Sequence, residues 1–504
     1  MIRKRFVLFC LAEFFFKHPA LMAGMTLYFS AFFFLGSVFS LLYFSLFIFP
    51  IGFLYPKRAL LLIILFFLST SLFSYWHLYP KSNDEGRATL VITEVREKTH
   101  LFDRKVWELR GNLKEFISKD GKKIAAHIPY VTTISEKVGR PEANALYEVE
   151  GSITIQKNRK ARLRVPTHSA WKRVKKKWAS PELRFHLKKR FQAFLEKKFT
   201  NKEASRFLGA LVTGDLDDSV MRKEFSRLGL THLLAISGFH FSLLAFFFYL
   251  LFKIFLEPKK LALLLLFLLT GYLLFIGKSA SIERSYIMIA TYLISGFLKK
   301  RYTPLNSLGI AAIVIIIRDP TAILEIGFQF SFLATGAILL LYSPIEKLLE
   351  MALPKRPLST ILAFSLLEQH ALLLLAILRK SLSLTLSITL ALAPLLLFYF
   401  HNFPLISLLI NLFFPFLVSI SLFLLFLALI IPWDLLHSIN NAYTSYLLTL
   451  TAFPPTPLNK TLWISSFPLW LVIPYLIILF LGAIILREYT EKKKAYGAFS
   501  PFFV

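Results

Sequence analysis

Residues 229–243 read Gly-Leu-Thr-His-Leu-Leu-Ala-Ile-Ser-Gly-Phe-His-Phe-Ser-Leu, where a long basic and polar region gives way to almost unbroken apolar sequence. This stretch carries small, polar and ionisable residues at positions that otherwise suit a membrane interior: Thr231, His232, Ser237, Gly238, His240 and Ser242. Polar groups at membrane depth are unfavourable unless they face protein or water. We therefore expect this stretch to line an internal surface.

The composition is that of a helical membrane protein. Of the 504 residues, 56% are apolar and only 18% are charged. Several apolar runs approach the roughly 20 residues that cross a bilayer core. The segments of about ten alternating residues that mark a transmembrane β-barrel are absent from the apolar half. The sequence predicts a polytopic α-helical membrane protein with more than one structural unit.

Apolar runs predict the membrane spans. Residues 21–55 suit two short spans with a turn near 36–41, and residues 59–75 suit a third. In the second half we expect roughly seven to ten membrane helices, some of them discontinuous. The spans predicted there are 237–255, 261–275, 287–297, 308–317, 328–341, 360–378, 382–400, 405–431, 442–453 and 469–486.

The formal net charge of +29 has two explanations that the sequence leaves open. Lys and Arg fill cytoplasmic loops and hold anionic lipid head groups, or they neutralise a polyanionic substrate. The cations at residues 3–5 and 57–58 predict a cytoplasmic N-terminus and an uncleaved first segment. Two spans before Lys57 and one after it would place residues beyond 80 on the outer face. Cys10 is the only cysteine, which excludes an internal disulfide and a cysteine-based metal site.

Residues 81–166 predict a small soluble domain. Short stretches there alternate apolar and polar residues, and turn signals such as Asp120-Gly121 separate them. About five strands in about 80 residues suit an inserted OB-like β-barrel.

A basic region follows the predicted β-domain. Residues 157–177 hold ten Lys or Arg and no acid, and we expect residues 167–205 to form a basic amphipathic helical segment. Residues 157–177 are either a strand edge followed by an amphipathic helix on the membrane surface, or a patch that collects phosphates at a pore mouth. The candidates for phosphate or DNA contact here are Lys172, Arg173, Lys175, Lys176 and Lys177.

Two motifs resemble a known family. Thr213-Gly-Asp-Leu-Asp-Asp, followed by Phe225-Ser-Arg-Leu-Gly-Leu-Thr-His-Leu-Leu-Ala-Ile-Ser-Gly-Phe-His, closely resembles the signature of the ComEC competence proteins. These are membrane channels that pass single-stranded DNA into the bacterial cytoplasm, and their N-terminal soluble domain is OB-like. The resemblance continues at Gly277-Lys-Ser-Ala-Ser-Ile-Glu-Arg-Ser, Thr303-Pro-Leu-Asn, Asp319-Pro, Gly327-Phe-Gln-Phe-Ser-Phe-Leu-Ala, Asn411 and Pro415. It implies that the motif positions are Gly214, Asp215, Ser281, Asn306 and Asn411.

Longer family members end in a metallo-β-lactamase-like domain. This chain has no His-x-His-x-Asp-His cluster. The resemblance therefore implies a short member without nuclease activity.

The residues from His232 to His240 are the first candidates for lining a pathway. The two histidines broadly share a helical face if the helix is continuous, whereas a break at Gly238 would expose backbone groups to a cavity. Interhelical packing through Ser and Gly is the alternative. A nucleophile–base pair of Ser237 and His240 lacks an evident third orienting group, so we predict no catalytic residue, metal or cofactor.

Three further polar residues lie among the apolar runs. Arg284 precedes the apolar helix predicted at 287–297, where it would pair with an acid, contact phosphate or extend to the interface. Gln329 and Ser331 either line the path or hold helices together.

The acids Asp215, Asp217 and Asp218 precede a predicted helix at 220–228. Helix capping is the simpler interpretation, because an Asp at a helix start accepts free N–H groups. Asp215 has the stronger functional claim because it matches the family motif.

Together the expectations are these. Residues 1–80 form N-terminal membrane helices, 81–166 the OB-like domain, 167–205 the basic segment, 206–487 the competence-type channel domain and 488–504 a cytoplasmic tail. The resemblance implies a non-enzymatic, multi-pass inner-membrane channel for single-stranded DNA in natural transformation, with its soluble domain on the outer or periplasmic face.

Partners would supply the energy, since the chain has no Gly-x-x-x-x-Gly-Lys-Ser/Thr phosphate loop. The implied partners are single-stranded DNA, the lipid bilayer, a cytoplasmic DNA-pulling helicase, an outer DNA receptor and a separate nuclease; a homo-oligomer is left open. The alternatives are a transporter of a small or lipid-linked anion on the same scaffold, and a membrane-embedded hydrolase.

Overall fold

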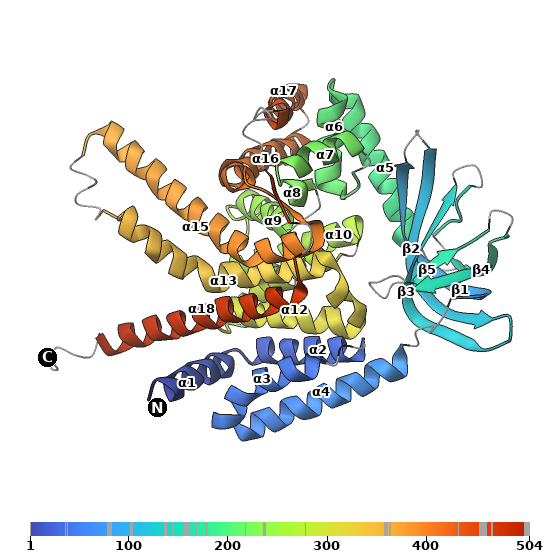
Figure 1. The fold of residues 1–504 in the computed structure, drawn as a ribbon. Helices are drawn as coiled ribbons and strands as arrows, with labels where there is room; N and C mark the ends of the chain where they lie inside the picture. Colours follow the sequence, from blue (N-terminus) through green and yellow to red (C-terminus); the bar gives the residue numbers. More distant parts are fainter. Residues whose placement is uncertain are drawn as a thin grey trace.

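A helical body carries a separate six-stranded sheet at one end, and both termini lie at the other end (Figure 1). This computed structural model describes residues 2–497 apart from 36, 38, 78–82, 101–103, 136–138, 144, 156–160, 167–168, 177–179, 217, 235–237, 278, 357–360, 362–363, 432, 453–460 and 465–466.

The chain begins with four helices, α1 (Ile2–Lys17), α2 (Pro19–Phe34), α3 (Phe39–Leu54) and α4 (Pro56–Trp76). Helices lie where we expected two short spans and a third, longer one, although only α4 is long enough to cross a membrane. The chain leaves helical conformation near the predicted turn. Proline is the first residue of both α2 and α4, where its fixed φ suits a helix start and its missing N–H is not needed.

The other helices follow the sheet. They are α5 (Ser180–Lys198), α6 (Lys202–Thr213), α7 (Ser219–Arg227), α8 (Thr231–Leu234), α9 (Gly238–Phe252), α10 (Pro258–Ile276), α11 (Ala280–Phe297), α12 (Pro304–Arg318), the 3₁₀ helix η2 (Pro320–Leu324), α13 (Ile326–Ala352), α15 (Leu366–Phe400), α16 (Ser407–Ile430), α17 (Asp434–Ala452) and α18 (Leu469–Gly497). A short ribbon, β7 (Asn402–Pro404) with β8 (Thr461–Trp463), lies among them.

Six of the described helices are long and apolar enough to cross a membrane: α4, α10, α13, α15, α16 and, within α18, residues 470–488. Four shorter apolar helices, α2, α3, α9 and α12, accompany them. Five of the long and two of the short helices follow residue 206, so seven apolar helices are described where we expected roughly seven to ten.

Two predicted boundaries are wrong. The spans expected at 360–378 and 382–400 are one 35-residue helix, α15, because Arg379-Lys380 between them are good helix formers. In addition, α11 starts at Ala280 rather than near 287, because Ser279 caps it by accepting the N–H of Ile282. Arg284 therefore lies within the helix. By contrast, the candidate membrane segment of α18 ends at Glu488 and the helix continues as far as Gly497, so the cytoplasmic tail at 488–504 stays a prediction.

The sheet domain consists of β1 (Asp84–His100), β2 (Arg104–Ser118), β3 (Lys123–Ser135), β4 (Ala145–Ile155), β5 (Ala161–Arg164) and β6 (Lys172–Lys176). β1 pairs with both β2 and β4, β2 with β3, and β5 lies parallel to β3 and antiparallel to β4. Its apolar core is separate from those of the helices and includes Leu90, Leu109, Phe116 and Ile153. The expected separate β-domain is confirmed, and the OB-like barrel stays a prediction.

The expected helical segment at 167–205 is wrong in its first part. Residues 172–176 form β6, which pairs antiparallel with β4 and places Lys172 opposite Glu148. Opposite charges on paired strands stabilise this alignment, and β4 would otherwise have free backbone groups along this edge. The helix of this segment, α5, begins only at Ser180.

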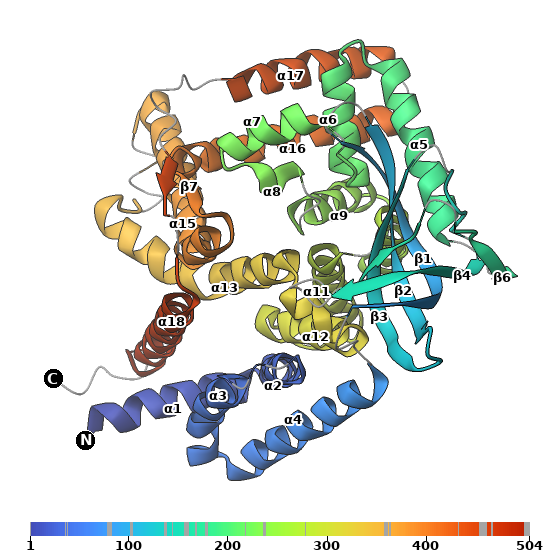
Figure 2. The ribbon, with the colours of Figure 1, turned by 45° about the vertical axis from the view of Figure 1, so that its right-hand side comes forward.

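The N-terminal helices share their cores with later helices. Side chains of α1, α3 and α4 pack with Leu305 of α12, Ala337 of α13 and Ala391 of α15. α2 lies against α12, where a Cβ on Gly309 would come within 2.3 Å of the Leu21 nitrogen. The residues expected as an N-terminal unit and as a channel domain are thus built into one helical body (Figure 2).

Candidate functional site

The stretch that opens the membrane half forms two helices. α8 ends at Leu234 and α9 begins at Gly238, while residues 235–237, Ser237 among them, lie outside the described part of the chain. The described part of α9 begins at Gly238, and the break that we predicted there stays a prediction.

The two histidines of this stretch lie in different surroundings. His232, in α8, is exposed, and its Nδ1 lies 3.2 Å from the carbonyl oxygen of Gly229. His240, in α9, is buried. The shared helical face considered for them stays a prediction, because residues 235–237 between the two helices lie outside the described part of the chain.

Gly238 allows the start of α9 to approach α11 closely. A Cβ at this position would lie 2.4 Å from Oγ of Ser285 and 2.5 Å from Nη2 of Arg284. Both distances are shorter than any ordinary carbon contact, so a side chain at position 238 would force the side chains of Ser285 and Arg284 to move. Gly238 therefore has the close interhelical contact that the packing alternative predicts, and one of the residues it contacts is the cation Arg284.

Arg284 is buried in α11, and among the described residues it hydrogen-bonds only neutral groups. Its Nε donates to Oγ of Ser331 in α13 at 2.8 Å, and Nη2 donates to Oγ of Ser285 at 3.1 Å. Nη1 lies 3.5 Å from the sulfur of Met288. Ser331 in turn donates to Oγ of Ser281 at 3.0 Å. Ser281, Arg284, Ser331 and Gly238, four of the predicted site residues, thus form one cluster.

No carboxylate of the described residues forms an ion pair with Arg284. The adjacent Glu283 is buried, but it pairs with Arg318 of α12. A buried cation is unfavourable without a charged partner. An acid partner on a neighbouring helix, which we considered for Arg284, is not found among the described residues, and the guanidinium is the buried positive centre of the cluster.

Gln329 lies two residues before Ser331 but is fully engaged. Its Nε2 donates to the carbonyl oxygen of Ile323 at 2.9 Å, and its Oε1 accepts from the Tyr399 hydroxyl at 2.7 Å. These bonds join η2 and α15 to α13. The amide thus has the contacts expected of a residue that holds helices together.

Three other motif residues lie at helix ends or between helices. Gly214 ends α6 in the left-handed conformation, with φ of 77°. Asn306 of α12 accepts the N–H of Ala20 at 3.2 Å and so satisfies a free donor at the start of α2. Asn411 is half-buried in α16, and its Oδ1 has no partner among the described residues.

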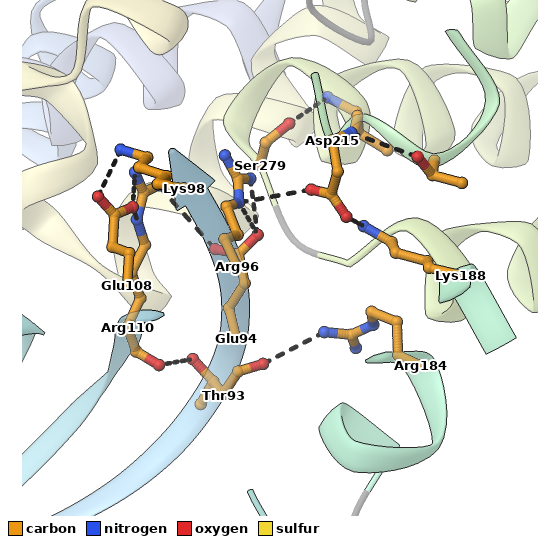
Figure 3. A network of polar contacts seen from close by, with 12 residues as sticks. Thr93, Glu94, Arg96, Lys98, Glu108, Arg110, Arg184, Lys188, Asp215 and Ser279 are labelled. Carbon is orange, nitrogen blue, oxygen red and sulfur yellow. Dashed lines mark hydrogen bonds and ion pairs between the residues drawn. The ribbon is translucent and has the colours of Figure 1, made fainter. Parts of the chain in front are cut away.

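Asp215 joins the sheet domain to the helical body (Figure 3). Its carboxylate pairs with Lys188 of α5 at 2.9 Å and lies 3.7 Å from Nε of Arg96 in β1. Burial lowers the pKa of Lys188, although Asp215 opposes this by favouring the charged amine. Asp218 instead caps α7 by accepting the N–H groups of Val220 and Met221, as predicted, and Asp217 lies outside the described residues.

The basic candidates of the sheet domain lie apart from this cluster. Lys172, Arg173 and Lys175 are exposed on β6. Figure 2 shows β6 at the outer edge of the sheet domain, away from α11. Lys177 and the side chain of Lys176 lie outside the described part of the chain. The structure thus separates an exposed basic strand from a buried basic centre.

Sequence reasoning missed the polar partners of Arg284 and Asp215. Ser285 follows Arg284 directly and extends the polar run from Ser279, so the sequence carried a signal for it. Lys188 and Arg96 carried none, because they are distant from Asp215 in the chain. The described residues contain no group of three or more metal-ligating side chains. The cluster around Arg284 contains guanidinium donors, which suit an anion chemically.

The fold defines a multi-pass helical membrane protein with a separate sheet domain. A sequence model described as Competence protein matches residues 212–489, more than half of the chain. The chain therefore belongs to the competence protein family, and the resemblance to the ComEC proteins is confirmed.

The chain is also similar to ComE operon protein 3 of Bacillus subtilis (strain 168), with 28% identity over 221 residues. The match covers 42% of this chain and spans only 25% of that relative. No solved structure matches the chain.

Proposed function

We propose that this protein passes single-stranded DNA through its helical body into the bacterial cytoplasm during natural transformation. Membership of the competence family supports a role in DNA uptake. The Arg284 cluster, which lies within the matched residues, supports the passage of an anionic chain.

The observation that carries the proposal is the set of neutral partners around Arg284. A carboxylate partner would hold the guanidinium permanently, whereas the hydroxyls of Ser285 and Ser331 can yield its donors to phosphate oxygens. Conduction needs binding that is favourable enough for entry and weak enough for exit. One buried arginine with two hydroxyls meets both conditions for a phosphodiester that moves past it.

We propose that the sheet domain is an OB-like barrel on the outer face of the inner membrane. Two observations support it: β1 pairs at both sides, with β2 and with β4, and a parallel contact joins β3 to β5. In this arrangement exposed Lys172, Arg173 and Lys175 would gather the DNA backbone before it enters the helical body.

The proposed mechanism requires no covalent step. We propose that a cytoplasmic helicase pulls the strand and that an outer receptor delivers it, with strand degradation left to a separate nuclease. His232 and Gly238 are proposed to line the path, the first through its exposed ring and the second by admitting the start of α9 next to Arg284. Roles for Ser237 and His240 in the path also stay proposals.

The test is import of fluorescently labelled DNA into cells that lack the chain and are complemented with variants. Arg284→Gln keeps a hydrogen-bonding side chain but removes the charge. We expect it to lower import about tenfold or more at equal protein abundance, equivalent to ~1.4 kcal/mol, and Arg284→Lys to restore part of it.

The matched control is Arg206→Gln, which removes the same charge from an exposed arginine of α6 and should leave import unchanged. Wild-type import by cells without the chain would refute the DNA role. Full import by Arg284→Gln would refute the role of the cluster.

A single buried cation also fits one small or lipid-linked anion. This second candidate predicts normal DNA import in cells without the chain, together with loss of uptake of such an anion. The same complementation panel separates the two functions, because only the proposed function links Arg284 to DNA.

A further inference from the structure

The motif residue Asp215 has contacts that the transport proposal does not use. It follows the C-cap glycine of α6, and its backbone N–H donates to Oγ1 of Thr213 at 3.3 Å. Its carboxylate then faces away from the helical body toward α5 and β1 (Figure 3). A residue of the helical body thus presents its charge to the sheet domain.

Two cations share this carboxylate. Lys188 binds Oδ2 at 2.9 Å and Arg96 lies 3.7 Å from Oδ1, while Arg96 also pairs with Glu94 at 2.6 Å. The Lys188 side chain is only 11% exposed, whereas that of Asp215 is 36% exposed. The pair is therefore partly open to solvent, and salt screens it in part.

The neighbouring contacts of α5 serve the same junction. Arg184, one helical turn before Lys188, donates to the carbonyl oxygen of Thr93 in β1 at 3.2 Å and to that of Leu274 in α10 at 2.8 Å. Lys189 pairs with Glu97 of β1 at 2.9 Å. The carbonyl of Leu274 is one of the free acceptors at the end of α10, which favours a cation there.

We infer that Asp215 is a positioning residue, which fixes the sheet domain on the helical body through Lys188 and Arg96. The segment from Thr93 to Glu97 of β1 is thereby held between α5, the end of α10 and the turn after α6. Asp215 does not touch the transported molecule in this role. The inference holds for any cargo, so it stands apart from the proposed function.

The test measures the distance between the two parts in the purified full-length chain. Spin labels replace Lys114, exposed on β2, and Lys223, exposed on α7, after Cys10→Ser removes the only cysteine. Pulsed electron paramagnetic resonance then gives the distribution of distances. We expect one main distance in the parent and about a tenfold rise of undocked distances in Asp215→Asn.

Two variants make the result specific. Asp218→Asn changes the same charge three residues away, keeps a good helix cap and touches no sheet residue that the structure describes, so its distances should match the parent. Asp215→Glu should restore docking, because a longer carboxylate can still reach Lys188.

Lys188→Met removes the ion-pair partner of Asp215 on α5 and should give the same distances as Asp215→Asn. It also serves as the test if Asp215→Asn fails to fold. Undocking should increase with salt in the parent and less in Asp215→Asn. A parent-like distribution in both Asp215→Asn and Lys188→Met would overturn the inference, and so would equal broadening by Asp218→Asn.

Discussion

Replacing Gly309 by Ala should separate α2 from α12. The new Cβ would lie 2.3 Å from the Leu21 nitrogen and 2.4 Å from the carbonyl carbon and oxygen of Ala20. Ordinary contacts begin at 3.4 Å, so the helices would have to part by 3.4 − 2.3, about 1.1 Å. These neighbours are backbone atoms, which cannot rotate away as a flexible side chain can.

The same movement would break a hydrogen bond. Oδ1 of Asn306 accepts the N–H of Ala20 at 3.2 Å, and a shift of about 1.1 Å along this bond lengthens it beyond hydrogen-bonding range. Overpacking costs about 1–3 kcal/mol, and an unsatisfied buried donor about 1–3 kcal/mol. Because the helices can relax partly, we expect Gly309→Ala to lower the free energy of unfolding by about 2–4 kcal/mol.

The assay is titration of the purified chain with sodium dodecyl sulfate in mixed micelles, followed by intrinsic fluorescence. Gly271→Ala is the matched control, since a Cβ there meets nothing within 4 Å, and it should be neutral or slightly stabilising. The double variant Gly309→Ala/Asn306→Ala should lose less stability than the sum of the losses of the two single variants, because Gly309→Ala already breaks the Asn306 bond. Equal stability of Gly309→Ala and Gly271→Ala, or full additivity, would refute this account.

Three further predictions concern other parts of the chain. Burial opposes ionisation of Glu182, but the hydrogen bond from Arg140 lowers the pKa of this carboxyl below its usual 4.5. The ionised Glu182 therefore stabilises the fold above about pH 4.5, and this stabilisation is lost as the pH falls through the lowered pKa. Arg140→Ala should reduce that loss, as measured by unfolding at about pH 7 and about pH 3. Glu488 is buried and binds Lys17 at 2.7 Å, so Glu488→Gln should lower the free energy of unfolding by about 1–2 kcal/mol in the detergent titration. Ser365→Ala removes a capping box and should cost about 1 kcal/mol, seen as faster hydrogen exchange in the first turn of α15.

Local patterns predicted much of the fold. The alternation at residues 145–155 coincides with β4, and the apolar runs coincide with most helices. The strand at 172–176 could not be predicted, because Lys-Arg-Val-Lys-Lys also suits a helix. What makes it a strand is the free edge of β4 with Glu148 opposite Lys172, and that edge exists only once the sheet has formed.

The candidate site was predictable in its members but not in its contacts. Gly238, Arg284 and Ser331 were named from their types and positions, yet nothing local shows that α9, α11 and α13 bring them together. The start of α11 could have been found, since Ser279 is a good N-cap followed by an acid in the first turn. The ion pairs of Asp215 could not have been found in this way, because Lys188 and Arg96 lie in elements that are distant in the sequence.

The short helices have a consequence for the membrane around this protein. α2, with 16 residues, and its neighbour α12, with 15, are each about 22–24 Å long. The hydrocarbon layer is about 30 Å thick. α2 is covered by its neighbours, whereas α12 exposes Ile310, Val314 and Ile317. Lipids next to this face of α12 must compress, or water must enter from one end. The insulating layer is then thinnest beside α12, so a charged group crosses less hydrocarbon there than elsewhere in the bilayer.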